Sequence, residues 1–533
     1  MLLVASLALA AAPDAAETRA SLLRLVEQAD DLACLTPLVA QLHEHWEEFT
    51  PDEQARIRAI LSPPTAPLFA PVVERVRPVP AKAAPPPAKD SCWSWSDNRV
   101  VGEHFVVEWE DGVNSDLADQ WLEDLELSWE VQVDEYGWRE ADGSDKYLLV
   151  ALIRDQRSGG AYTSVQSCGG ESIPYMVSGD DSWNDPEWGA TMAAHEFNHM
   201  LQFGYGDAPE FWWWEATATW VEDSVFPDSN YWSAYVYGYT QAPYISMSAS
   251  DQNDRDVFNH MYGMAIFAFY LDDYQGGHDT VRQTWEDAID DRSRYERGAE
   301  DMIEELDLDW QTVYADFVTK NTVMDYNQQR WFPEVEEEES VKSLPAHGRS
   351  GRDTVPQGYG QNFLKFADGM GEGDLVIEFE GEGNVDWSVQ LVESKGKRVN
   401  RVVSIVVENG SGELTLEGYG DEEVMLVVSP LIWRENEYEY SWTANLVVAP
   451  EDTGTDSPTG DGAGESEGEG GAVDVGAGAC GCASGGSGAA GLVPAVALAG
   501  LLRRRAPKNS QSPSLPMSSG RWCARGDLNP HGD

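Results

Sequence analysis

The spacing of apolar residues divides the chain into a region of strands followed by helices and a region of strands alone. Apolar runs at 105–109 and 146–153 predict two strands, and shorter runs predict two more at 159–164 and 172–177. Positions that repeat with the helical period predict helices over 115–134, 212–224, 256–274, 278–290, 297–305 and 309–322. This order indicates an α+β domain over residues 90–335, in which a mixed sheet precedes a helical subdomain.

Between residues 346 and 449 the hydrophobic period changes to two. Short alternating stretches are separated by Gly-rich or Asn-Gly turns, and the predicted strands are 375–379, 387–391, 402–407, 413–416 and 424–428. This spacing predicts an all-β sandwich domain over 346–449. The glutamate-rich stretch 334–345, which joins it to the α+β domain, is predicted to be an exposed hinge.

The N-terminal segment combines an export signal with helical periodicity. Residues 1–12 form an apolar run that ends in small residues, which is typical of a signal peptide, although they lack its positive region. In 13–61 apolar residues recur with the helical period, and Thr50 is expected to cap a helix that begins at Pro51. This segment is either a pro-segment or an accessory helical domain, and the Pro- and Ala-rich stretch 62–89 is predicted to be a linker.

The C-terminal tail has the composition of a disordered linker followed by a sorting signal. Residues 450–479 are mostly Gly, Asp, Glu, Ser and Thr, which predicts disorder. In 480–505, two cysteines precede an apolar run too short to span a bilayer, and Arg503-Arg504-Arg505 ends the stretch. That layout predicts attachment to a membrane or cell surface. Residues 506–533 are predicted to be unstructured.

Length and charge restrict the class of protein. A chain of 533 residues exceeds one ordinary core. The formal net charge of −58 argues against a nucleic-acid partner, because a polyanion would be repelled. It suits a soluble protein that acts outside a cell, and we expect a monomer. Cys92 and Cys168 flank the start of the α+β region, and a disulfide and two free thiols remain equally open.

The strongest chemical signal is the run His195-Glu196-Phe197-Asn198-His199. On a helix, residues four apart share a face, so the two imidazoles would bind one Zn²⁺ together. Glu196 lies about 100° around the helix from His195, where its carboxylate would act as general base toward a water. The alternative is an ordinary helix with two surface histidines.

Two histidines leave a catalytic zinc site one protein ligand short. The metzincin arrangement would need glycine at Gln202 and histidine at Tyr205, so the sequence excludes it. A carboxylate is the remaining choice, and the candidates are Glu210, Glu215 and Glu222. We favour Glu215, in the first turn of a predicted helix, with Glu222 as the second choice. Thr219 and Glu222 share its face and are expected to orient the ligands.

These motifs resemble those of the gluzincin superfamily, to which thermolysin belongs. The likeness rests on His195-Glu196-Phe197-Asn198-His199 and on Trp214-Glu215-Ala216-Thr217-Ala218, and it looks like that of secreted metalloproteases of myxobacteria. The stretch from Cys480-Gly481-Cys482 to Arg503-Arg504-Arg505 resembles the Myxo-CTERM sorting tail.

The resemblance implies a gluzincin or thermolysin-like catalytic fold and a set of roles. The zinc ligands would be His195, His199 and Glu215. Glu196 would take a proton from a water and pass it to the leaving amine. An oxyanion-stabilising Tyr or His is expected, and Tyr262 is chosen over His260. An extended substrate would pair with an edge strand, for which 159–164 is the candidate.

We therefore expect a secreted or surface-anchored zinc-dependent endopeptidase, on the outer-membrane side of a Gram-negative bacterium, that acts on proteins or peptides. The alternative is a catalytically silent surface adhesin or binding protein that retains the peptidase fold. A metal-dependent hydrolase of glycans or lipids is a third possibility. The presence of all candidate ligands together with Glu196 favours an enzyme.

Overall fold

The computed structural model describes most of the chain between residues 90 and 448. Gaps lie at 156–159, 206–210, 252–253, 291–298 and 421, and before residue 90 the described residues are 48–61 and a few positions from 19 to 45. The predicted signal peptide, both predicted linkers and the sorting tail lie outside the described residues. The described residues up to 448 belong to one compact unit. Among the helices that the structure describes, none combines the length and the apolar character needed to cross a membrane.

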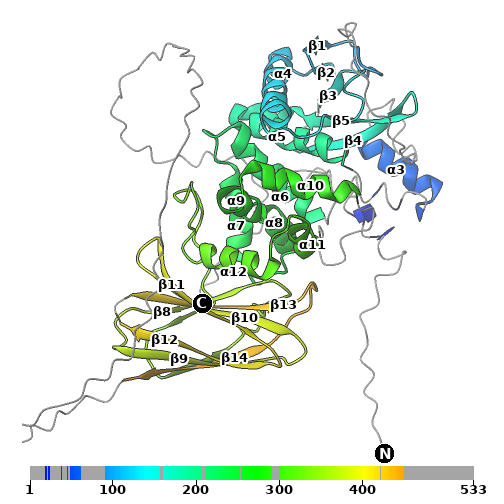
Figure 1. Cartoon of the computed structure of the whole chain (residues 1–533). Coiled ribbons are helices and arrows are strands. Elements are labelled where there is room, and N and C mark those ends of the chain that lie inside the picture. Colours follow the sequence, from blue (N-terminus) through cyan, green and yellow to red (C-terminus); the bar gives the residue numbers. More distant parts are fainter. Residues whose placement is uncertain are drawn as a thin grey trace, which may run out of the picture. The chain divides into compact units, whose positions relative to one another are not determined.

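A five-stranded mixed sheet forms the first part of the α+β region (Figure 1). Its strands are β1 (Arg99–Val101), β2 (Phe105–Trp109), β3 (Leu149–Arg154), β4 (Ala161–Cys168) and β5 (Glu171–Gly179), in the order β1-β2-β3-β5-β4. β2, β3 and β5 run parallel, whereas β1 and β4 are antiparallel strands at the two edges. The four predicted strands are confirmed. β1 is an addition, because three residues are too few for a periodic signal.

The helices follow the predicted segments. They are α4 (Ser115–Trp129), the π-helical segment η3 (Glu130–Glu135) that continues it, the 3₁₀ segment η4 (Asp180–Asn184), α5 (Pro186–Gln202), α6 (Phe211–Val225), α7 (Trp232–Gln241), α8 (Arg255–Gly263), α9 (Ala265–Tyr274), α10 (His278–Asp290), α11 (Ala299–Glu305) and α12 (Trp310–Asn321). The predicted helix 256–274 is divided at Met264 into α8 and α9. α7 was not predicted, because its Tyr, Val, Trp and Thr residues are typical of strands and only packing makes them helical.

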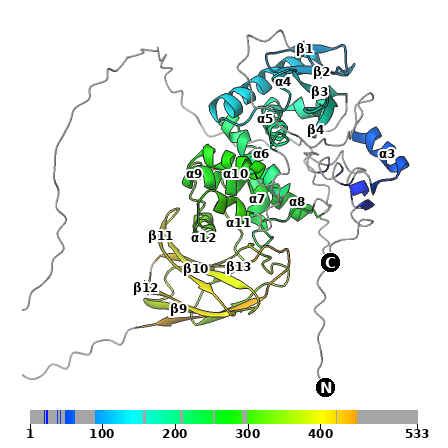
Figure 2. The same cartoon turned by 45° about the vertical axis from the view of Figure 1, so that its right-hand side comes forward.

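Both faces of the five-stranded sheet are buried, which explains the nearly continuous apolar run of β3. Alternate residues point to opposite faces. The helical face receives Leu149, Ala151 and Ile153, and the other face receives Leu148, Val150 and Leu152. On that other face they meet apolar residues of the N-terminal segment, namely Leu22, Leu38, Leu42, Phe49 and Ile57. Figures 1 and 2 show α3 (Pro51–Leu61) across the sheet from α4 and α5. The N-terminal segment is therefore part of the packing of the sheet.

Local signals start two of these helices. Thr50 and Glu53 cap α3 by exchanging hydrogen bonds between side chain and backbone, which confirms the predicted start at Pro51. Asp185 caps α5 by accepting hydrogen bonds from the first backbone N–H groups of the helix. From Thr191 onward α5 is buried on all sides, so its polar side chains must find partners inside the protein.

Two sheets that share one core follow the helices, as the two-residue period predicts. One contains β6 (Glu339–Val341), β8 (Asn362–Phe366), β10 (Asp386–Ser394), β11 (Val399–Val407) and β13 (Glu423–Leu431), and the other contains β7 (Ala346–Arg349), β9 (Gly373–Gly381), β12 (Ser411–Tyr419) and β14 (Tyr440–Val447). The chain is thus of mixed α+β class. The hinge predicted at 334–345 is wrong in part, because β6 lies inside it and pairs with β8. Only Val341 of β6 is buried, so its sequence shows no alternation. The strand-rich region begins near Glu339 rather than at 346.

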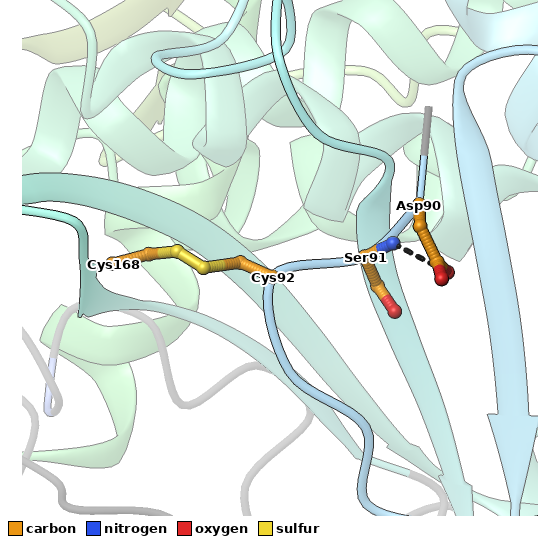
Figure 3. Close-up of a disulfide and its surroundings, with 4 residues drawn as sticks. All are labelled: Asp90, Ser91, Cys92 and Cys168. Carbon is orange, nitrogen blue, oxygen red and sulfur yellow. Dashed lines mark hydrogen bonds between the residues drawn. A yellow bond between two sulfur atoms is a disulfide. The ribbon is translucent and has the colours of Figure 1, made fainter. Parts of the chain in front are cut away.

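A disulfide joins Cys92 to Cys168, whose Cα atoms are 6.3 Å apart (Figure 3). Cys168 is the last residue of the edge strand β4. Cys92 follows Ser91, which forms an isolated bridge to Leu148 just before β3 and donates its backbone N–H to Asp90. The bond therefore ties the end of β4 to the segment that enters the sheet. Of the two cysteine states left open by the sequence, the structure contains the disulfide.

Candidate metal centre

Three of the predicted site residues meet in the core. His195 and His199 lie one turn apart on α5, and Glu215 approaches them from the start of α6. Glu215 Oε2 is 3.1 Å from His195 Nε2, and Glu215 Oε1 is 3.4 Å from His199 Nε2. All three are buried, and one ligand atom from each lies within 4.8 Å of the others. In the described part of the chain, no other group of His, Cys, Asp or Glu side chains is arranged in this way.

The ring nitrogen of His195 that faces away from Glu215, Nδ1, contacts a second carboxylate. His195 Nδ1 lies 2.9 Å from Glu222 Oε1, two turns beyond Glu215 on α6. Glu222 is thus placed to orient His195, as predicted, and not as the alternative third ligand. Burial raises the pKa of Glu222, against the effect of His195. Thr219 does not share this role, since its buried hydroxyl has no hydrogen bond among the described residues. Glu210 lies outside the described residues.

The ring nitrogen of His199 that faces away from Glu215, Nδ1, contacts a side-chain amide that was not predicted from the sequence. His199 Nδ1 lies 2.6 Å from Gln202 Oε1. Gln202 Nε2 donates to the backbone carbonyl of Trp214 over 3.1 Å, and because a carbonyl only accepts, the amide must present its oxygen to His199. Nδ1 therefore carries the ring proton, and Nε2 turns its lone pair toward Glu215. The available signal was a polar residue three positions after a histidine on a wholly buried helix.

This arrangement fits a bound cation. The lone pair of His199 Nε2 and the carboxylate oxygen of Glu215 would repel each other at 3.4 Å unless a positive charge offsets them. Burial raises the pKa of Glu215, but its interactions with the His199 and His195 rings outweigh burial and lower the pKa to about 2, so this carboxylate is ionised and available as a ligand. Two imidazole nitrogens and one carboxylate oxygen are a ligand set that catalytic zinc sites use.

Glu196 lies next to the triad and contacts the edge strand of the sheet. Its carboxylate Oε2 accepts a hydrogen bond of 2.7 Å from Thr163 Oγ1 in β4, and its backbone oxygen lies 2.9 Å from the same hydroxyl. Both residues are buried. The predicted general base is thus fastened to β4. Thr163 was not singled out from the sequence, although the predicted edge strand 159–164 contains it.

Tyr262 lies beside His195. Their ring centroids are 6.1 Å apart and the rings are nearly parallel, at 17°. The Tyr262 ring also stacks with that of Tyr235, at a centroid distance of 5.2 Å. His260, two residues before Tyr262 on α8, points to nearly the opposite side of the helix. Its ring is fully buried and lies 5.7 Å from that of Tyr239. Of the two oxyanion candidates, Tyr262 is the one next to the triad.

Comparison with known proteins adds a family but no activity. A family model described as "Family of unknown function (DUF6055)" matches residues 73–428. No curated protein matches the chain. Among solved structures, the pre-peptidase C-terminal domain of a collagenase from Bacillus anthracis is 12% identical, with 21% of this chain and 98% of that domain covered and a TM-score of 0.15. A family GH115 4-O-methyl-α-glucuronidase is 8% identical, with 49% of this chain and 39% of that enzyme covered and a TM-score of 0.14. Likenesses this weak support no statement about fold or function.

Proposed function

The chain belongs to the DUF6055 family, and we propose that it is a zinc-dependent endopeptidase of the gluzincin type. The observation that carries this proposal is the convergence of His195, His199 and Glu215 in one buried group, with Glu196 next to the first histidine. A mixed sheet with an antiparallel edge strand beside the motif helix supports a gluzincin-like catalytic fold.

The zinc would be held by His195 Nε2, His199 Nε2 and an oxygen of Glu215. Three protein ligands leave a fourth position for water or substrate. Held by these three ligands, zinc would polarise the substrate carbonyl and lower the pKa of a water. Glu222 and Gln202 engage the two Nδ1 atoms and so keep both Nε2 atoms directed at the ion.

Glu196 and Tyr262 would carry the proton transfer and the charge stabilisation. Glu196 would accept a proton from the attacking water on its carboxylate and pass it to the nitrogen of the departing amine. Thr163 would hold that carboxylate in place. Tyr262 would donate a hydrogen bond from its phenol to the carbonyl oxygen as that oxygen gains negative charge.

The edge strand β4 suggests how an extended substrate would bind. β4 lies at the end of the sheet, with β5 as its strand neighbour in the described part of the chain. A peptide that added itself to this edge would be held by backbone hydrogen bonds, which recognise a chain of any sequence. Since Thr163 of β4 contacts Glu196, such a peptide would lie close to the proposed base. This supports protein or peptide substrates over glycans or lipids.

The proposed site of action is outside the cell, in solution or at the surface. The Cys92–Cys168 disulfide supports an oxidising compartment, where such bonds persist. The signal-like residues 1–12 and the sorting-like tail 480–505 point the same way.

The decisive test is Glu196→Gln, which keeps the size of the side chain and removes the base. Zinc content of the purified full chain and hydrolysis of casein are measured together. We expect zinc to remain bound and the rate to fall by roughly 100-fold or more. Glu187→Gln, an exposed change in the first turn of the same helix, is the control and should leave the rate unchanged.

Other outcomes would point elsewhere. Full activity in Glu196→Gln would sink the mechanism. Zinc binding by a wild-type chain that hydrolyses no peptide would favour the silent binding protein. Zinc-dependent hydrolysis of a glycan or lipid ester, with no hydrolysis of casein, would favour the third class of function.

A further inference from the structure

Three buried amides connect the π-helical segment to His199. They are Gln132 in η3 and Asn198 and Gln202 in α5, and we call them the amide relay. We propose that the relay is a positioning device, which fixes the proton of His199 on Nδ1 and thereby directs Nε2 at the metal. This inference rests on the proposed zinc site and gives a role to Gln132, which lies far from the motif in sequence.

The first half of the relay has one possible direction. Gln132 Nε2 donates to the backbone carbonyl of Ala194 over 3.0 Å, so the amide oxygen of Gln132 faces Asn198. Asn198 Nδ2 donates to that oxygen over 3.0 Å and therefore turns its own oxygen toward Gln202. Gln202 Nε2 donates to it over 2.7 Å, which leaves Gln202 Oε1 for His199.

The second half of the relay is fixed independently from α6. One N–H of Gln202 Nε2 goes to Asn198, and the other is shared between the carbonyl of Trp214 and Thr217 Oγ1, which lies 2.9 Å away. The hydroxyl of Thr217 donates its own proton to the carbonyl of Trp213 over 2.8 Å, so toward Gln202 it accepts. Backbone carbonyls thus set the direction at both ends, and both ends require His199 Nδ1 to be the donor.

The neutrality of the relay suits the charge around it. The buried site already contains three carboxylates, those of Glu196, Glu215 and Glu222. A fourth behind His199 would add a further desolvation cost. An amide accepts the Nδ1 proton without adding charge, but it can flip, so its orientation must come from further partners. That requirement explains why the support of His199 extends as far as Gln132.

Gln132 comes from a kind of segment that recurs at functional sites. At the C-terminal end of η3, the backbone N–H of Tyr136 donates to the carbonyl of Val131, five residues earlier, which defines a π-turn. Such turns are rare and frequently lie at functional sites. The Gln132 side chain is fully buried, and both of its polar ends are used by α5.

The test measures metal affinity of the full chain, by competition with a chromophoric chelator for Zn²⁺ and Co²⁺. Gln202→Met and Gln132→Met remove the hydrogen bonds at similar volume. We expect affinity to fall by about 10–100-fold in Gln202→Met and by roughly tenfold in Gln132→Met. Because Gln132 acts through Gln202, the double variant should bind about as weakly as Gln202→Met alone.

Two further variants separate positioning from folding. Gln390→Met is the matched control, since Gln390 is a buried glutamine of β10 that donates to Ala315 and accepts from Thr319. Its metal affinity should equal that of the wild type. Gln132→Glu, which burial keeps in its neutral protonated form, can still donate to Ala194 and accept from Asn198, and it should recover most of the affinity lost in Gln132→Met. The visible spectrum of bound Co²⁺, which reports ligand geometry, should change in Gln202→Met and not in the control.

The failures of the two proposals are distinguishable. Wild-type affinity in Gln132→Met, or independent losses that multiply in the double variant, would overturn the relay and leave the zinc site standing. The zinc site itself fails if the wild type and His195→Ala bind Zn²⁺ equally. Unfolding midpoints of the metal-free variants show whether a weak binder is folded. If Gln132→Met is unfolded, the metal affinity of Gln132→Glu is compared with that of a folded Gln202→Met instead. Equal affinities in these two variants would overturn the relay.

Discussion

At the scale of residues, the two histidines of the triad are supported differently. His195 is backed by the carboxylate of Glu222 and His199 by the amide of Gln202. A carboxylate behind an imidazole raises its basicity more than a neutral acceptor does. His195 is therefore expected to be the stronger donor to a bound metal.

Thr163→Val should slow turnover without removing the metal. The change deletes the hydroxyl that holds the Glu196 carboxylate, and a hydrogen bond to a charged group contributes about 1.5–3 kcal/mol. A fall in kcat of roughly tenfold or more is expected from that loss, with KM and zinc content nearly unchanged. Steady-state kinetics on a peptide and metal analysis measure both. Thr163→Ser keeps the hydroxyl and should retain most of the activity; an unchanged kcat in the valine variant would contradict the role.

His260 should make folding stability depend on pH. Burial lowers its pKa from 6.5 to about 3, and neither ring nitrogen has a hydrogen-bond partner among the described residues. The ring stays neutral in the folded state but gains a proton on unfolding below pH 6.5. Stability is therefore lost as the pH falls from 6.5 toward 3, by about 2 kcal/mol at pH 5 from this residue.

Chemical unfolding at pH 8 and pH 5 measures the effect of His260. His260→Leu should lose less stability on acidification than the wild type, whatever its stability at pH 8. His347→Leu, at an exposed position of β7, is the control and should follow the wild type. Parallel pH curves for His260→Leu and the wild type would show that the buried ring does not titrate on unfolding.

At the scale of elements, α5 combines the chemistry with the core. Its polar side chains face three different neighbours: Glu196 meets β4, Asn198 meets η3, and His195 meets α6. Each contact satisfies a polar group that burial would otherwise leave without a partner. The N-terminal segment covers the opposite face of the sheet and is held there by apolar contacts. It packs as a structural layer, whether or not it also acts as a pro-segment.

Ile57→Ala should destabilise the α+β region. Ile57 of α3 is fully buried against the sheet face formed by residues such as Val150. Removing its side-chain atoms should lower the free energy of unfolding by about 2–5 kcal/mol. Denaturant unfolding followed by tryptophan fluorescence measures this loss. Arg56→Ala, at the exposed neighbouring position, should change it little, and equal stability of both variants would show that the segment does not stabilise the sheet.

At the scale of the whole molecule, the compact unit joins segments that are far apart in sequence. The sheet has buried clusters on both faces, and the disulfide closes a separation of 76 residues around its edge strand. The core of the helical side also includes Phe363 and Val427 of the strand-rich region. The two regions therefore share apolar packing and are not linked by an exposed hinge alone.

Replacing Cys92 and Cys168 with alanine should lower the free energy of unfolding by about 4 kcal/mol. The disulfide restricts the unfolded chain, and the entropy that it removes there is large for a loop of this length. Thermal unfolding with and without dithiothreitol provides the measurement. The reductant should bring the wild type down to the level of the double variant and leave the double variant unchanged. A wild type that is insensitive to the reductant would mean that the two thiols are free in solution.

The sequence by itself determined what depends on residues close to one another along the chain. The spacing of His195 and His199, the cap at Thr50, the helical periods and the two-residue period of the later strands all arise within a few turns. The choice of Glu215 also came from the sequence, because a carboxylate at a helix start is a local feature.

Only the tertiary structure decided what joins separate elements. It placed Glu222 behind His195, Thr163 on Glu196 and Gln132 at the start of the relay, and it paired Cys92 with Cys168. The direction of a buried hydrogen bond depends on which elements pack together, and that packing is set by burial of apolar faces over the whole unit. A five-residue motif therefore identifies a candidate metal site, whereas the orientation of its ligands is a property of the folded protein.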